Sequence, residues 1–307
     1  MDAPAIWRAV EWKKGLRLAA WGSVLVVVVI AGLVAFNGLV MAKANVAIVG
    51  SIEEGAASKS IGKREVRIVA FNLAKLELHH GGLRFDSADA VRKRVRAVGA
   101  LLSDAAPDIV CLSEVVQECS LCPVDQVREL AMATGLRHYA FGECYNFGLP
   151  FFRIVGGNAI LSRWVIDAST NGDIPGRKPF WVTRNNRRTL CVRIPYLDNV
   201  WVASVHHDSF DADNNLAQIR DLLRQIDRRQ FIVAGDFNAL PASRSMRLLE
   251  ESGEFAGNFD GVGTFPASAP TQRIDYVLAP SEWRLMSERV LPPVVSDHRA
   301  VVAVFGR

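Results

Sequence analysis

The sequence predicts a layered α/β or α+β domain of two packed sheets flanked by helices, preceded by one transmembrane helix. Three observations lead to this prediction. Short apolar runs typical of buried strands alternate with amphipathic helical segments through residues 65–307. These segments form two halves, each with several strands and one or two helices. An uncharged apolar run at residues 18–41 precedes them.

The composition allows a large core and sets limits on the partner. Of the 307 residues, 50% are hydrophobic and 22% are charged. Residues 1–63 hold seven Lys/Arg and four Asp/Glu; subtracting these from the 36 basic and 32 acidic residues of the chain leaves 29 and 28 for residues 64–307. A nearly neutral domain lacks the basic footprint of a tight nucleic-acid binder, which disfavours nucleic acid as the substrate.

Residues 18–41 are predicted to cross a membrane as a helix. The run has 24 residues and no charge, more than the roughly 20 residues that span a bilayer. Trp21 lies near one end, where interfacial aromatics are common. The alternative is secretion after signal cleavage near Ala44, but the run exceeds the usual apolar region of a signal peptide, about 7–15 residues.

The flanking charges predict the orientation of this helix. Arg8, Lys13, Lys14 and Arg17 precede it, whereas only Lys43 follows closely. The positive-inside rule then makes residues 1–17 a cytoplasmic tail and places residues 45–307 outside the cytoplasm. Residues 42–64 are predicted to form a linker with room for one short ordered piece, and residues 65–307 to form the main folded domain. The lipid bilayer is the partner of residues 18–41; the sequence indicates no protein partner.

The first half of the domain begins with a strand at 66–71, which ends at Asn72. Ser87 is a candidate N-cap for a helix to about residue 103. A buried strand at 108–112 ends in Ser113-Glu114. A helix is predicted at 123–133 and strands at 136–141 and 159–162, with a loop or hairpin rich in glycine and aromatics at 142–157.

The second half contains predicted strands at 188–194 and 200–206, followed by an amphipathic helix at 213–228. A buried strand starting at residue 231 ends at Gly235. Three further strands are predicted at 273–278, 283–290 and 300–305. No internal repeat of solenoid period is present in the sequence.

Polar residues gather at the ends of the predicted strands. Each has an ordinary explanation alone, such as a turn for Asp236 and Asn238 or a core histidine for His206. Together they supply the parts of metal-assisted phosphoester hydrolysis: carboxylates for a hard cation, a histidine oriented by a carboxylate, and donors for phosphoryl oxygens. The sequence shows no clustered Cys/His set, which argues against zinc. The residues are Asn72, Glu114, Asn158, His206, Asp236, Asn238, Asp275, Asp297 and His298.

Seven short motifs occur in an order that resembles the endonuclease/exonuclease/phosphatase superfamily, which includes deoxyribonucleases, apurinic endonucleases and neutral sphingomyelinases. The resemblance covers about residues 65–306. The motifs are VAFN (69–72), PDIVCLSE (107–114), GNAILSR (157–163), SVH (204–206), GDFN (235–238), TFP with RIDY (264–266 and 273–276) and SDH (296–298). The chain departs from the pattern at Ser113, where many members have Gln.

The resemblance implies a four-layer α/β/β/α sandwich of two mixed sheets, with the site at the strand ends. It implies Mg²⁺ as the cofactor, with Mn²⁺ as the alternative cation. The roles it implies for individual residues are these: Glu114, Asn72 and Asp297 at the metal; His206, Asp236, Asn238, Asp275 and His298 in catalysis; Asn158 and Arg188 in substrate binding.

We therefore expect a membrane-anchored, Mg²⁺-dependent hydrolase of phosphate esters, acting outside the cytoplasm on a lipid head group or a small phosphodiester. The alternatives are a nuclease and a catalytically silent, membrane-tethered binding module. Five cysteines leave the thiol chemistry open: Cys111 is predicted to be buried, and a disulfide among Cys119, Cys122, Cys144 and Cys191 is compatible with an extracytoplasmic domain.

Overall fold

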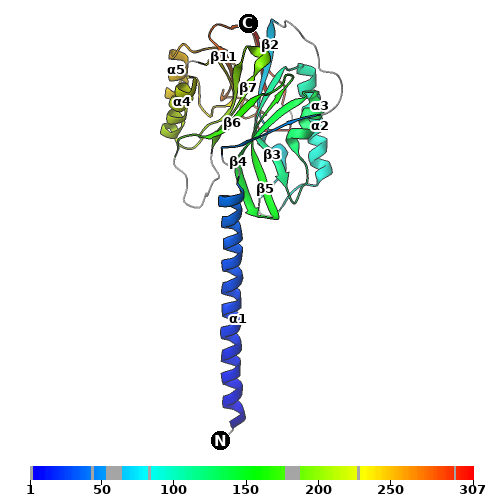
Figure 1. Cartoon of the computed structure of the whole chain (residues 1–307), viewed down its shortest axis with the longest axis vertical. Helices are drawn as coiled ribbons and strands as arrows, with labels where there is room; N and C mark the ends of the chain where they lie inside the picture. The colour runs from blue at the N-terminus through cyan, green and yellow to red at the C-terminus, as the bar shows by residue number, and fades with distance from the viewer. Residues whose placement is uncertain are drawn as a thin grey trace.

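A computed structural model describes residues 3–42, 45–52, 64–81, 84–176, 187–226, 229–293 and 295–307. It contains two mixed sheets packed face to face, with helices on the outer faces (Figure 1). The predicted α/β sandwich of two packed sheets is confirmed. The predicted linker residues 53–63 and residues 177–186 lie outside the described part of the chain.

The larger sheet has seven strands in the order β1-β4-β5-β3-β2-β13-β12. At its centre β2 runs parallel to β3, and the remaining neighbours pair antiparallel. The short ordered piece expected within residues 42–64 is β1, which forms one edge of this sheet. The bounds are β1 Ala47–Ser51, β2 Glu65–Asn72, β3 Ile109–Cys119, β4 His138–Leu149, β5 Phe152–Ser162, β12 Arg284–Val290 and β13 Val301–Gly306.

The smaller sheet has six strands in the order β10-β11-β9-β8-β7-β6. Here β8 runs parallel to β9, so each sheet contains one parallel pair. The bounds are β6 Ala168–Asp173, β7 Arg188–Ile194, β8 Val200–His206, β9 Phe231–Asp236, β10 Phe255–Gly257 and β11 Asp275–Pro280.

The helices cover the outer faces of the two sheets. On the larger sheet lie α2 (Ala88–Ala105) and α3 (Gln126–Thr134); on the smaller lie α4 (Ala212–Ile226) and α5 (Arg244–Glu251). Ser87 caps α2 as predicted, accepting a hydrogen bond from the Ala90 amide at 3.2 Å. Shorter turns are η1 (Asn37–Met41, π-helical), η2 (Ala74–Glu77) and η3 (Pro195–Leu197).

Three apolar cores hold the four layers together. The central core lies between the sheets and includes Ile68, Ile109, Val202 and Ile232. Alternate residues of the same strands face the helices: Val110 packs in the core under α2 and α3, and Val233 in the core under α4 and α5. Strands buried on both faces explain the continuous apolar runs in the sequence.

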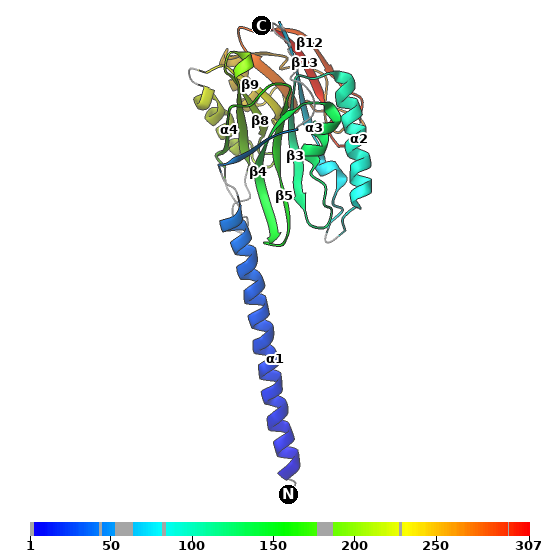
Figure 2. The same cartoon turned by 45° about the vertical axis from the view of Figure 1, so that its right-hand side comes forward.

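The N-terminal helix α1 (Ala3–Phe36) projects from the domain as a separate rod (Figures 1 and 2). Residues 12–41 are long and apolar enough to cross a membrane, and the apolar side chains Leu25 and Val27 are more than 60% exposed. All five cysteines are free, and all but Cys144 are buried.

Of the two predictions for residues 142–157, a loop or a hairpin, the hairpin is confirmed, because the strand pair β4–β5 takes in most of this region. Several other elements were not predicted. The short strands β6 and β10 and the helix α5 were missed. β6 (ASTNGD) contains no apolar run, β10 has only three residues and α5 only eight, so none of them gives a clear period in the sequence.

Candidate active site

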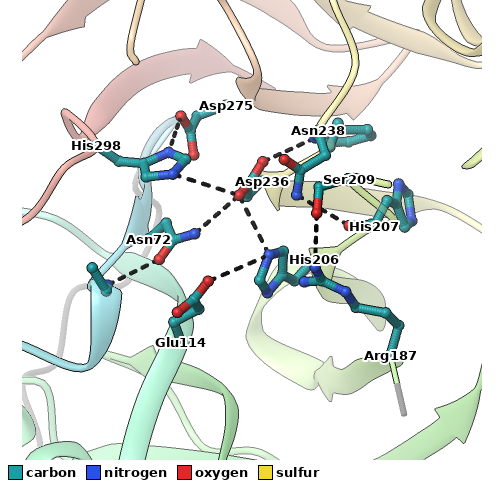
Figure 3. A network of polar contacts seen from close by, with 12 residues as sticks. Asn72, Glu114, Arg187, His206, His207, Ser209, Asp236, Asn238, Asp275 and His298 are labelled. Carbon is teal, nitrogen blue, oxygen red and sulfur yellow. Dashed lines mark hydrogen bonds and ion pairs between the residues drawn. The ribbon is translucent and has the colours of Figure 1, made fainter. Parts of the chain in front are cut away.

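The carboxyl ends of the two parallel pairs meet between the sheets. Asn72 ends β2, beside Ser113 of β3, while His206 ends β8 directly opposite Asp236 of β9. Because parallel strands end at one edge of a sheet, the side chains that follow them converge. Figure 3 shows Asn72, His206 and Asp236 pointing toward one another.

Asp236 lies at the centre of the polar network. Its Oδ2 accepts a hydrogen bond from Asn72 Nδ2 at 2.9 Å and lies 3.5 Å from His206 Nε2 and 3.8 Å from His298 Nε2. Its Oδ1 accepts a hydrogen bond from the backbone amide of Asn238 at 2.9 Å. Burial, followed by the nearby negative charge of Asp275, raises the pKa of Asp236 to about 7.

Asp275 and His298 form a buried pair behind Asp236. His298 Nδ1 lies 2.9 Å from Asp275 Oδ2, which also accepts the Thr264 hydroxyl at 2.6 Å. Burial alone would lower the pKa of His298, but the hydrogen bond and charge of Asp275, with the charge of Asp236, raise it to about 9. The imidazole is therefore a cation at neutral pH.

Glu114 lies at an irregularity of β3. The register with β5 shifts between Leu112 and Val115, and Glu114 has φ +51 there. Such a bulge re-aims a side chain. Burial would raise the pKa of Glu114, but the Lys75 ammonium, which contacts its carboxylate, and Arg187 hold that pKa below its usual value.

His206 stands between the two carboxylates, with Nε2 3.8 Å from Glu114 Oε1. Burial, then the positive charge of Arg187, lowers its pKa well below the ordinary value. The ring is therefore neutral at neutral pH, and its contacts with the carboxylates are not ion pairs. A neutral imidazole at this position can give or accept a hydrogen bond.

The network opens into a cavity of about 430 Å³. Seven predicted site residues line it: Asn72, Glu114, His206, Asp236, Asn238, Asp297 and His298. Asp297 is the most exposed of them, with 60% of its side chain accessible and Oδ1 4.0 Å from His298 Nε2. Asp275 lies behind His298, fully buried.

Asn158 and Arg188, expected to bind substrate, do not line this cavity. The Arg188 guanidinium is 1% exposed and its Nε donates to Asp173 Oδ1 at 2.7 Å. Asn158 is buried and its Nδ2 donates to the Arg188 carbonyl at 2.9 Å, so it ties the two sheets together. The structure therefore does not bring either side chain to the cavity, and their role in substrate binding stays a prediction.

Arg187 and Lys75 are the basic residues at the site that the sequence reading missed. Consecutive side chains of an extended chain point to opposite faces, so the buried Arg188 puts Arg187 on the cavity side. The sequence shows the Arg-Arg pair. Which of the two arginines faces the cavity depends on how the strand aligns with its neighbours, because a shift of one residue exchanges the two faces. Lys75 follows Asn72 by three residues in an irregular turn that no pattern predicted.

The residues around Glu114 suit a hard divalent cation. Glu114 is ionised and already attracts the Lys75 ammonium. The other oxygens at this part of the cavity are the Asp297 carboxylate and Asn72 Oδ1, which accepts the Ala74 amide at 3.0 Å and keeps a second lone pair. A second group, Asp236, Asp275 and His298, also has its ligand atoms within 4.8 Å of one another. In that group Asp275 Oδ2 already contacts His298 Nδ1 and accepts the Thr264 hydroxyl, whereas Asp275 Oδ1 has no hydrogen-bond partner among the described residues.

The fold and the site together define a class of protein: an α/β sandwich of two mixed sheets with carboxylates, amides and imidazoles gathered between their strand ends. The chain belongs to the endonuclease/exonuclease/phosphatase family, whose model matches residues 69–298. Members of that family are generally phosphoester hydrolases that depend on divalent metals. No curated protein sequence matches the chain.

Solved structures share this fold at low sequence identity. An endonuclease/exonuclease/phosphatase protein from Beutenbergia cavernae has a TM-score of 0.65 and 22% identity, over 80% of this chain and 72% of that one. The mannosyl-6-phosphatase Bt3783 from Bacteroides thetaiotaomicron has a TM-score of 0.56 and 14% identity, over 79% and 100%. A humanized D. rerio TDP2 has a TM-score of 0.55 and 17% identity, over 80% and 100%.

Proposed function

We propose that this protein is a metal-dependent phosphoesterase anchored in a membrane by residues 18–41, with its catalytic domain outside the cytoplasm. One observation carries the catalytic part. A buried carboxylate with a pKa of about 7, Asp236, lies 3.8 Å from an imidazole with a pKa of about 9, His298, and both line one cavity with the ionised Glu114.

Asp236 is the general base for the attacking water. A base is most effective when its pKa lies near the working pH, and burial has brought this carboxyl there. Asn72 fixes the orientation of the carboxylate through the 2.9 Å hydrogen bond to Oδ2. A hydrogen bond from the backbone amide of Asn238 holds the other carboxylate oxygen, Oδ1.

His298 stabilises charge on the phosphoryl oxygens. Asp275 keeps its ring protonated and oriented, and Thr264 in turn fixes Asp275. A cationic donor aimed at developing negative charge lowers the barrier most when it is held in place before the reaction. His206, Asn238 and Arg187 line the same cavity and add donors around the phosphate.

Glu114, Asn72 and Asp297 would hold the cation, with Mg²⁺ as the expected ion and Mn²⁺ as the alternative. Such an ion supplies Lewis-acid stabilisation of the phosphoryl charge. The substrate we propose is a lipid head group or a small phosphodiester. The apolar N-terminal helix and the balance of 29 basic and 28 acidic residues in 64–307 support this choice over nucleic acid.

Hydrolysis should depend on His298. The full-length protein in detergent, with Mg²⁺, is assayed on phosphatidylcholine micelles, bis(p-nitrophenyl) phosphate and plasmid DNA. His298→Ala should lower turnover by about 10²–10⁴-fold, while the control His80→Gln, half-exposed and away from the cavity, should leave it unchanged. Equal rates for His298→Ala and the wild type would refute the assignment; a preference for plasmid DNA would select the nuclease.

The anchor is tested separately, by mass spectrometry of the mature N-terminus. We expect residues 18–41 to remain on the membrane-bound protein. A mature chain beginning at Asn45 would show a cleaved signal instead.

A further inference from the structure

The tip of the β4–β5 hairpin carries a cluster of exposed aromatic side chains. Phe147 is 64% exposed and Phe151 73%, and Phe152 lies beside them. Leu121, in the turn after β3, is exposed at the same end of the sheet. Single exposed apolar residues are ordinary on soluble surfaces, but a contiguous group at one tip marks a contact surface.

An apolar cavity of about 310 Å³ lies under these residues. Its walls include Phe147, Leu149, Phe152, Cys119, Leu121 and Phe85. The charged side chains beside it are paired: Arg153 donates to both oxygens of Glu118, at 2.8 and 2.7 Å. The tip therefore presents apolar surface with its nearest charges neutralised.

The tip is fixed to the end of the N-terminal helix. Asn37 is buried, and its Nδ2 donates to Asn146 Oδ1 at 2.8 Å and to the Gly148 carbonyl at 3.1 Å. The hairpin points back along α1, toward the N-terminus of the helix, and its end passes the last turn of α1 in both views (Figures 1 and 2).

The length of the apolar run sets the depth of the tip. Arg17 is the last charge before the run, and about 20 residues separate it from the far side of a bilayer core about 30 Å thick. Counting from Leu18, the helix reaches that boundary at Asn37, the residue that holds Gly148. Phe151, at the turn of the hairpin, then lies at the depth of the lipid head groups or deeper in the bilayer.

We infer that the hairpin tip, defined as Phe147, Phe151 and Phe152 with Leu121, inserts into the lipid–water interface of the leaflet from which α1 emerges. The inference rests on the proposed membrane span of α1. Aromatic rings favour this interface, where an apolar body meets water. Burying the exposed rings adds a second membrane contact to the helix and fixes the tilt of the domain.

This orientation brings the reaction centre close to the lipid. β3 runs from Glu114 in the active site to Cys119 in the wall of the apolar cavity, a distance of about 17 Å for five residues of strand. The carboxyl ends of β2 and β3 therefore point toward the bilayer, with Asn72 at the end of β2 and Glu114 midway along β3, which deepens the proposal of a lipid head group as substrate.

Spin labels on the full-length protein in phosphatidylcholine nanodiscs test the inference. Phe151→Cys carries the label at the tip, and Val165→Cys, 57% exposed beyond the opposite end of β5, is the matched control. Val27→Cys reports on α1 itself. Accessibility is compared between dissolved oxygen, which partitions into lipid, and a water-soluble nickel chelate; the wild-type chain, treated in the same way, corrects for its own cysteines.

We expect the labels at residues 151 and 27 to be accessible to oxygen and shielded from nickel, and the label at 165 to be accessible to nickel. A lipid-shielded residue 27 with a water-exposed residue 151 would overturn the insertion of the tip and leave the anchor intact. A water-exposed residue 27 would overturn both. Metal-dependent turnover of bis(p-nitrophenyl) phosphate by the same Phe151→Cys variant reports on the catalytic proposal independently of either result.

Discussion

The ammonium group of Lys75 contacts the Glu114 carboxylate that we assign to the metal. The backbone that places it there is unusual: residues 74–77 all have φ between 44° and 57°, a left-handed turn without glycine. Gln126 holds this turn, donating from Nε2 to the Lys75 carbonyl at 2.9 Å and accepting the Val116 amide at 2.9 Å. Strain of this kind persists only where the surroundings determine the conformation, and it is common at functional sites.

Removing the Lys75 charge should strengthen cation binding. The ammonium competes with a divalent ion for Glu114, so Lys75→Met should lower the Mg²⁺ dissociation constant by about tenfold at low ionic strength. Isothermal titration calorimetry without substrate measures this directly. Lys93→Met, on the exposed face of α2, is the control and should leave the affinity unchanged. Weaker binding by Lys75→Met would mean that Lys75 helps to hold the site open.

His207 should make the protein sensitive to acid. Burial, then the charge of Arg187, lowers its pKa from 6.5 to about 3, and its ring packs edge-on against Phe237. Because the folded-state pKa lies below the unfolded value, this histidine contributes stability above pH 6.5, which is lost as the pH falls toward 3. Between these two pH values unfolding takes up at most one proton at this histidine, so the loss in the free energy of unfolding is a few kcal/mol at most.

The variant His207→Gln has no such titration. Urea unfolding between pH 7 and pH 4 should show a shallower loss of stability for His207→Gln than for the wild type. Parallel curves for the two proteins would contradict a buried neutral histidine.

Among the secondary-structure elements, the parallel pair β8–β9 delivers His206 and Asp236 to the site, and Gly235 makes this pairing possible. Gly235 has φ +144, and a Cβ there would lie 2.2 Å from the Val205 carbonyl oxygen. Only glycine adopts this backbone without strain. The same glycine was the signal that ended the predicted strand.

Gly235→Ala should therefore destabilise the protein and disturb the site. We expect a loss of at least about 2 kcal/mol in the free energy of unfolding, measured by urea denaturation, together with reduced turnover. Gly172→Ala in β6 is the matched control, since nothing lies within 4 Å of its Cβ, and it should be neutral or slightly stabilising. Equal stability of the two variants would contradict the close approach at Val205.

At this scale, the sequence predicts well the elements that end in site residues. Strands 188–194 and 200–206 were predicted at the bounds of β7 and β8, because buried strands give continuous apolar runs that end abruptly. The sequence predicts poorly the features that depend on which face of a strand a side chain occupies or on how strands pair. Arg188 was chosen over Arg187, and residues 142–157 were left open between a loop and a hairpin, because side-chain direction and strand pairing depend on contacts with other strands.

For the whole molecule, the ordered motifs were sufficient to predict the sandwich and the residues that converge. The apolar run was sufficient to predict the N-terminal helix. The relation between them was not predictable. The contact of Asn37 with Asn146 and Gly148, which positions the domain on the helix, joins residues more than 100 positions apart by ordinary amides. The Lys75–Glu114 contact likewise depends on a turn that only the folded chain defines.

The central claim is that Glu114 holds a divalent ion at a hydrolytic site. The most direct test is the Mg²⁺ dependence of bis(p-nitrophenyl) phosphate hydrolysis by the full-length wild-type protein and by Glu114→Gln, each first stripped with EDTA. We predict no wild-type turnover after stripping, saturable recovery with added Mg²⁺, and for Glu114→Gln a half-saturating concentration raised by at least about tenfold. Hydrolysis by the stripped wild type at its full rate, or an unchanged Mg²⁺ response in Glu114→Gln, would contradict the claim.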